Sequence, residues 1–78
     1  MSDRLIGVFS AVFKLDASEL TDETSPQNTS QWDSLAAMEL VTLIEDSFEV
    51  RLSTREIMKM NSIGAARTVL QSKGVAGI

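Results

Sequence analysis

Apolar residues recur at helical spacing in four separate stretches of this chain, and polar residues fill the gaps between them. In the first stretch the apolar positions lie three and four residues apart, as on one face of an α-helix. These positions are Leu5, Ile6, Phe9, Val12 and Phe13. We therefore expect a helix over residues 3–14, capped by the side chain of Ser2 or Asp3.

The longest helical pattern runs from Ser34 to Phe48 and directly follows Asp33, a residue type favoured as a helix N-cap. Apolar residues cover more than half of this predicted cylinder: Ala36, Ala37, Met38, Leu40, Val41, Leu43, Ile44 and Phe48. A helix that is apolar over so wide an arc must pack against several others. The remaining stripe is largely acidic and contains Glu39, Thr42, Asp46 and Glu49.

Two shorter helices complete the pattern. Ser53 and Glu56 have the spacing of a capping box, which predicts a short helix over residues 54–60. A last helix over 62–73 is expected from a stripe of Ile63, Ala66, Val69 and Leu70. Gly74 follows it as a C-terminal glycine cap. No segment alternates with period two, so we predict an all-α bundle of three main helices and one short one.

A long polar connection, from Leu15 to Asp33, separates the first two helices. Connections of this length are uncommon in compact domains unless they are functional or are held by the core. Leu15, Leu20 and Trp32 are the apolar residues available to hold it, and residues 17–20 can form a turn of helix. We expect the whole chain, residues 1–78, to be a single domain.

Charge and composition narrow the function classes. The formal net charge is −4 and the seven Lys and Arg residues are scattered singly, which argues against nucleic-acid binding and favours basic protein surfaces as partners. Cysteine and histidine are absent, which excludes disulfides, thiolate catalysis and the usual zinc sites. No stretch resembles a secretory signal or a membrane span. We therefore expect a cytoplasmic monomer that does not bind membranes.

Ser34 is the residue with the clearest chemical potential. As the first residue of the longest helix it lies beside free backbone N–H groups and the positive end of the helix dipole, a favourable place for a phosphate. Leu35 falls on the acidic stripe, so it either contacts another protein or packs on the preceding loop. The sequence offers Ser34 no nearby histidine or lysine as a base, which makes a small enzyme a poorly supported interpretation.

The segment Trp32-Asp33-Ser34-Leu35 opens a helix after a long loop in a chain of 78 residues. The stretches that follow are Met38-Glu39-Leu40-Val41, Ile44-Glu45-Asp46, Phe48-Glu49-Val50 and Ile63-Gly64-Ala65-Ala66. With these motifs and spacings the chain resembles the acyl carrier protein family, from Leu5 to about Leu70.

The resemblance implies that Ser34 carries 4′-phosphopantetheine, with Asp33 as the helix cap beside it. A separate phosphopantetheinyl transferase would attach this arm from coenzyme A, and acyl groups would be carried as thioesters on its thiol. The resemblance also implies that the chain is not an enzyme. Its acidic helix would dock on basic surfaces of acyl-loading and acyl-processing enzymes. The docking residues carried over from the family are Leu35, Glu39, Glu45 and Asp46.

Three questions stay open from the sequence. The residues Met38, Val41, Ile57, Met58 and Met60 either line a gap that shelters an acyl chain between the second and third helices or belong to the core. Gln31 and Ala36 depart from the family's commonest residues, which favours a specialised pathway over housekeeping fatty-acid synthesis and leaves fatty acyl, polyketide or other cargo open. The alternative function is an unmodified helical adaptor that binds basic partners through the acidic helix, whose charges otherwise form a solvated face.

Overall fold

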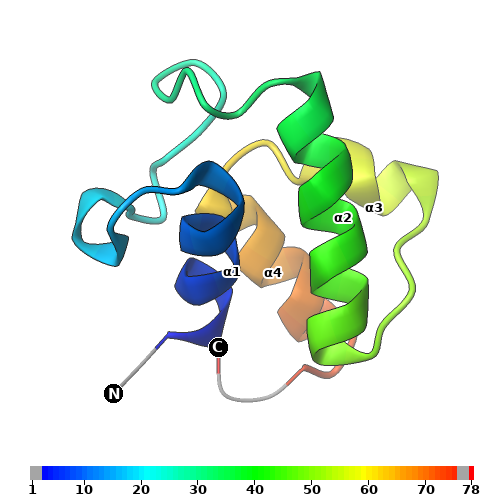
Figure 1. Cartoon of the computed structure of the whole chain (residues 1–78). Helices are drawn as coiled ribbons and strands as arrows, with labels where there is room; N and C mark the ends of the chain where they lie inside the picture. Colours follow the sequence, from blue (N-terminus) through cyan, green and yellow to red (C-terminus); the bar gives the residue numbers. More distant parts are fainter. Residues whose placement is uncertain (1–2, 76–77) are drawn as a thin grey trace.

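The computed structural model describes residues 3–75 and 78, and every regular element in that part of the chain is a helix (Figure 1). The elements are α1 (Arg4–Phe13), the short 3₁₀ helix η1 (Ala17–Glu19), α2 (Ser34–Phe48), α3 (Thr54–Lys59) and α4 (Ile63–Ser72). The predicted bundle of three main helices and one short helix is confirmed, with each end within one residue of its expected position. None of these described helices combines the length and apolar character needed to cross a bilayer.

Side-chain caps fix the helix ends, as the sequence predicts. Asp3 caps α1 by accepting hydrogen bonds from the N–H groups of Leu5 and Ile6. Ser53 and Glu56 form the expected capping box at α3. The Ser62 side chain caps α4 by accepting a hydrogen bond from the Ala65 N–H. Gly74 follows Lys73, the C-cap of α4, and its φ of 88° is a left-handed conformation that glycine adopts without steric cost.

One core joins the main helices. α1 packs against both α2 and α4, α3 packs against α4, and α1 and α2 run in opposite directions (Figure 1). The largest fully buried side chains come from three helices and are Leu5, Phe9, Ile44, Ile63 and Leu70. The apolar stripe predicted for the last helix is therefore buried as expected, because Ala66 and Val69 are buried together with Ile63 and Leu70.

The long loop between α1 and α2 is held at both its middle and its end. Trp32 is buried, and its ring lies 5.2 Å from the Phe9 ring and 5.5 Å from the Phe13 ring, centroid to centroid. Leu20 is also buried and Leu15 packs against the core, so the predicted anchors are confirmed. Because Trp32 immediately precedes Asp33, this aromatic cluster also fixes where α2 begins.

Backbone hydrogen bonds add a second attachment that the pattern did not predict. The N–H groups of Ile63 and Gly64 donate to the carbonyls of Thr24 and Asp22 at 3.0 and 2.9 Å. A Cβ at position 64 would lie 3.1 Å from the Asp22 carbonyl oxygen, so the glycine permits this close approach. The unpaired N–H groups at the start of α4 thus find their partners in the loop.

Arg67 on α4 joins the loop to the start of α1. Its guanidinium donates to the Asp3 carboxylate at 2.8 Å and to the Asp22 carboxylate at 2.9 Å. The hydrogen bond from Arg67 holds the pKa of Asp3 below its ordinary value, and the bonds to Asp3 and Asp22 raise the pKa of Arg67. The ion pair between Arg67 and Asp3 therefore stabilises the folded protein while the Asp3 carboxylate is charged.

Candidate functional site

Ser34 lies exposed at the first position of α2, between a buried anchor and a rigid helix. The Asp33 backbone is extended, and its carboxylate turns back to accept a hydrogen bond from the Ala36 N–H at 2.9 Å. The predicted N-cap is therefore confirmed. Because Trp32 is buried on one side and the cap holds the other, the serine is presented at a fixed place on the surface.

The backbone around Ser34 is suited to an anion. The first helical hydrogen bond of α2 runs from the Ala37 N–H to the Asp33 carbonyl at 2.9 Å. The N–H groups of Ser34 and Leu35 precede that bond and have no carbonyl four residues back within the helix. They carry the positive end of the helix dipole, so a phosphate attached to the Ser34 hydroxyl would lie in a favourable field.

A hollow of about 300 Å³ lies beside this serine, with both of its sequence neighbours, Asp33 and Leu35, in the lining. Lys14 is the basic residue in that lining. It ends α1 in a left-handed conformation, with a φ of 58°. The hollow therefore offers room beside Ser34, and its lining combines one positive charge, Lys14, with the carboxylates of Asp33 and Glu39. The sequence pattern does not single out Lys14, because its distance from Ser34 depends on how the loop returns.

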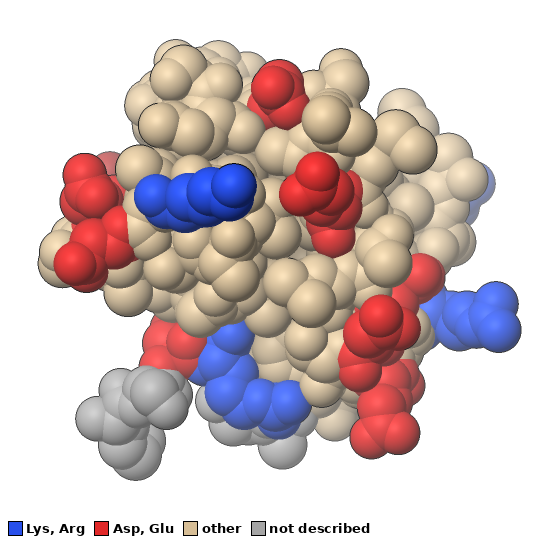
Figure 2. All heavy atoms as spheres, viewed as in Figure 1, with Lys and Arg blue, Asp and Glu red and all other residues tan. Residues whose placement is uncertain are grey.

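The residues predicted to bind partners fall into two groups. Leu35 is 66% exposed, and Glu39 and Asp46 are also exposed. Figure 2 shows acidic side chains spaced along the side of the molecule where α2 lies. Glu45 differs, because it is half-buried and its carboxylate accepts a hydrogen bond from the Leu52 N–H at 2.8 Å. Glu45, which the resemblance carries over as a docking residue, therefore does not face mainly solvent: it helps to hold the chain that follows α2.

The five residues considered for an acyl pocket are placed in different environments. Met60 is buried in the core and Val41 is half-buried, whereas Met58 is 76% exposed and Ile57 lies at the surface of α3. Met38 is 70% exposed, so its assignment to the apolar arc of α2 is wrong. At 100° per residue it lies about 200° around the helix from buried Ala36, next to the acidic stripe.

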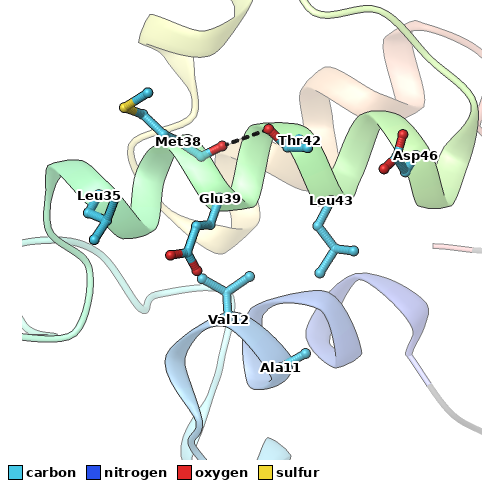
Figure 3. Close-up of a pocket in the computed structure, with 8 residues that line it drawn as sticks. All are labelled: Ala11, Val12, Leu35, Met38, Glu39, Thr42, Leu43 and Asp46. Atoms are coloured by element: carbon cyan, nitrogen blue, oxygen red, sulfur yellow. Dashed lines mark hydrogen bonds between the residues drawn. The ribbon is translucent and has the colours of Figure 1, made fainter.

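Met38 instead belongs to the lining of a hollow of about 520 Å³ on the α1 side of α2. The other lining residues are Ala11, Val12, Leu35, Glu39, Thr42, Leu43 and Asp46. Figure 3 shows Leu35, Glu39 and Leu43 projecting toward α1, with Ala11 and Val12 opposite, while Met38 points away from α1. None of the other four residues considered for the acyl pocket lines this hollow.

Comparison with known proteins agrees with this geometry. Residues 3–68 match the family model described as phosphopantetheine attachment site. The chain belongs to the acyl carrier protein family. It also resembles the solution NMR structure of the holo acyl carrier protein from Geobacter metallireducens, with a TM-score of 0.81 and 31% sequence identity. That match covers 91% of this chain and 82% of the Geobacter protein.

Membership of the acyl carrier protein family fixes the broad role of this carrier. It is a carrier of acyl groups and not an enzyme, and its covalent cofactor is 4′-phosphopantetheine. Such a carrier works with a phosphopantetheinyl transferase and with biosynthetic enzymes.

Proposed function

We propose that Ser34 is the attachment point of 4′-phosphopantetheine in this carrier, and that it serves a specialised fatty-acid, polyketide or related pathway. The observation that carries the proposal is the exposed Ser34 hydroxyl at the first position of α2, beside the Asp33 cap. When attached, the arm supplies a thiol, which this cysteine-free chain lacks, and acyl groups are held on that thiol as thioesters. The departures Gln31 and Ala36 support the specialised pathway.

The chain's own residues contribute position and charge. Trp32 and Asp33 hold the serine in place, and the free N–H groups of the first turn stabilise the phosphate. Exposed Leu35, Glu39 and Asp46 form a small surface that we propose docks on basic patches of partner enzymes. Charge on such a surface steers the encounter with a partner enzyme. The small apolar area keeps each complex short-lived, which a carrier with several partners requires.

The test is incubation with coenzyme A, Mg²⁺ and a promiscuous phosphopantetheinyl transferase, followed by intact mass measurement. We expect the wild-type protein to gain one phosphopantetheinyl group and Ser34→Ala to gain none while keeping its helical circular dichroism. Ser30→Ala, which removes another exposed serine of the same loop, is the matched control and should be modified at the wild-type rate. If the wild type gains no mass while a control carrier is modified, the adaptor function becomes the better explanation.

A further inference from the structure

Acidic and basic residues occupy different parts of this chain. The segment between Lys14 and Arg51 contains nine acidic residues and no Lys or Arg. From Arg51 to the last residue there are five Lys and Arg and a single acidic residue, Glu56. Helix α2, whose charges are all acidic, is therefore followed by a segment whose charges are mainly basic.

The fold accounts for three of these five cations. Arg67 and Lys73 form ion pairs with carboxylates of other segments. Arg51 lines a hollow together with three acidic residues around the end of α2. Arg55 and Lys59 on α3 are both exposed, and neither forms an ion pair within residues 3–75.

The place of Arg55 does not favour the stability of its own helix. It is the second residue of α3, directly after the Ser53 cap, so its guanidinium lies near the positive end of the helix dipole. No carboxylate of the described residues pairs with it there, and its side chain is exposed. Folding therefore does not explain why a cation stands at this position.

Arg55 is the centre of an exposed face of α3 that we call the α3 outer face: Arg55, Met58 and Lys59. At 100° per residue, Met58 and Lys59 lie within about 60° of Arg55 around the helix. Met58 is 76% exposed, whereas Glu56 is turned to α4, where it binds Lys73. α3 lies at the edge of the bundle in Figure 1, and Figure 2 shows basic side chains projecting at that edge.

We propose that the α3 outer face docks on an acidic surface of a partner enzyme, in which carboxylates surround an apolar recess. The two cations pair with the carboxylates, and the recess covers Met58, whose flexible thioether adapts to irregular shapes. This docking adds to the docking proposed for α2 and does not depend on attachment at Ser34.

The opposite signs of α2 and α3 give this face a role in choosing partners. An enzyme that binds both helices must present basic and acidic patches side by side, which fixes the orientation of the carrier on it. An enzyme whose basic surface continues beneath α3 is repelled by Arg55 and Lys59. The α3 outer face thus selects among the enzymes that α2 alone would accept.

The experiment is an NMR titration of the ¹⁵N-labelled carrier at low salt, with two short helical peptides as probes. One peptide carries glutamates around a central leucine, and the other has lysine in place of each glutamate. We expect the acidic peptide to shift the backbone amides of residues 54–60, and the lysine peptide to shift those of α2 instead. Because the unmodified chain is used, a failure here is separate from a failure of attachment at Ser34.

Charge variants show whether the α3 outer face is responsible. Arg55→Glu should weaken binding of the acidic peptide about fivefold, as expected when an exposed ion pair is lost and a repulsion replaces it. It should keep α3 folded, because a carboxylate is favourable in the first turn of a helix. Lys14→Glu makes the same change of net charge at another exposed position and should weaken binding less than about twofold, because distant charges are screened. Arg55→Lys should bind as the wild type does.

Three outcomes would overturn the proposal. The first is an acidic peptide that leaves residues 54–60 unshifted, and the second is equal weakening by Arg55→Glu and Lys14→Glu. The third is a shift of residues 54–60 that grows with carrier concentration in the absence of peptide. That result would mean that the acidic helix of a second copy of the chain occupies this face.

Discussion

The two ends of α2 belong to one helix, yet the rest of the chain covers them very differently. At the first end Ser34, Leu35 and Met38 are exposed, and the Asp33 cap and the Trp32 ring hold only the start of the backbone. At the other end the Arg4 guanidinium lies 4.8 Å from the centre of the Phe48 ring and donates to the Ser47 carbonyl at 2.9 Å.

Two acidic side chains of α2 differ in the same way, although Asp46, beside Glu45, is exposed. Glu39, near the open end, is exposed, whereas the Glu45 carboxylate is bound by the Leu52 N–H. A carboxylate that satisfies a backbone N–H of its own chain is less available to a partner than one that faces water. The comparison shows that side chains at the first end face solvent, while Arg4, Phe48 and Glu45 help to hold the bundle together at the second.

The largest expected effect concerns packing on the two sides of this helix. Ile44→Ala removes a fully buried side chain and should lower the free energy of unfolding by about 2–5 kcal/mol. Met38→Ala, six residues earlier, should change it by less than about 0.5 kcal/mol because this side chain is 70% exposed. Urea unfolding measures both, and Ile44→Val, with an expected loss of about 0.5–1.5 kcal/mol, serves if the alanine variant is too unstable. Equal losses for Met38→Ala and Ile44→Ala would contradict the division.

A charge reversal tests the exposed acidic side chains of α2. The double variant Glu39→Lys, Asp46→Lys should slow modification by the phosphopantetheinyl transferase about tenfold at low salt, because electrostatic steering of this size is typical of complementary surfaces. Its unfolding free energy should change little, since both side chains are exposed. Added salt should narrow the difference from wild type. Unchanged rates at low salt would mean that these charges form only a solvated face.

Glu45→Ala is the matched change at the tied end. It should lower stability by about 1 kcal/mol by leaving the Leu52 N–H without its acceptor. Its effect on the modification rate should be smaller than that of the charge reversal. A larger rate effect than at Glu39 and Asp46 would place Glu45 among the contact residues.

The smallest effect is a pH dependence of the ion pair between Arg67 and Asp3. Arg67 lowers the pKa of Asp3, so the unfolded chain takes up this proton at a higher pH than the folded protein does. The stability from the pair is therefore complete at neutral pH and is lost as the pH falls through the pKa of folded Asp3. Asp3→Asn keeps a good helix cap but removes this part of the acid sensitivity, at most about 1 kcal/mol for such a partly exposed pair. Urea midpoints at neutral and acid pH measure the difference, and identical acid losses in both proteins would contradict it.

Local chemistry explains why the helices and the serine could be predicted from the sequence. A cap acts within three or four residues, so Asp33, Ser53 and Ser62 each mark a helix start without reference to the rest of the fold. Trp32 could likewise be expected to hold the loop, because a large apolar ring in a polar segment must find cover. The place of Ser34 follows from these two local features.

The errors concern the surroundings of α2. Periodicity gives the angle of a side chain around its own helix, but not which part of that circumference the neighbouring helices cover. Met38 was therefore placed on the apolar arc of α2 although it is 70% exposed, and Glu45 was grouped with the docking residues although the chain after α2 folds back onto it. The hollow of about 520 Å³ between α1 and α2 could not be predicted for the same reason, since Val12 and Leu43 come together only when the two helices pack.

The sequence by itself determined the helices, their caps and the presentation of a serine at the start of the longest one, because these depend on interactions between residues close in the chain. The tertiary structure alone decided which acidic residues stay exposed, how the long loop binds the start of α4, and where a hollow opens beside Ser34. Those features depend on contacts between segments far apart in the sequence, and the helical pattern carries no information on how such segments meet.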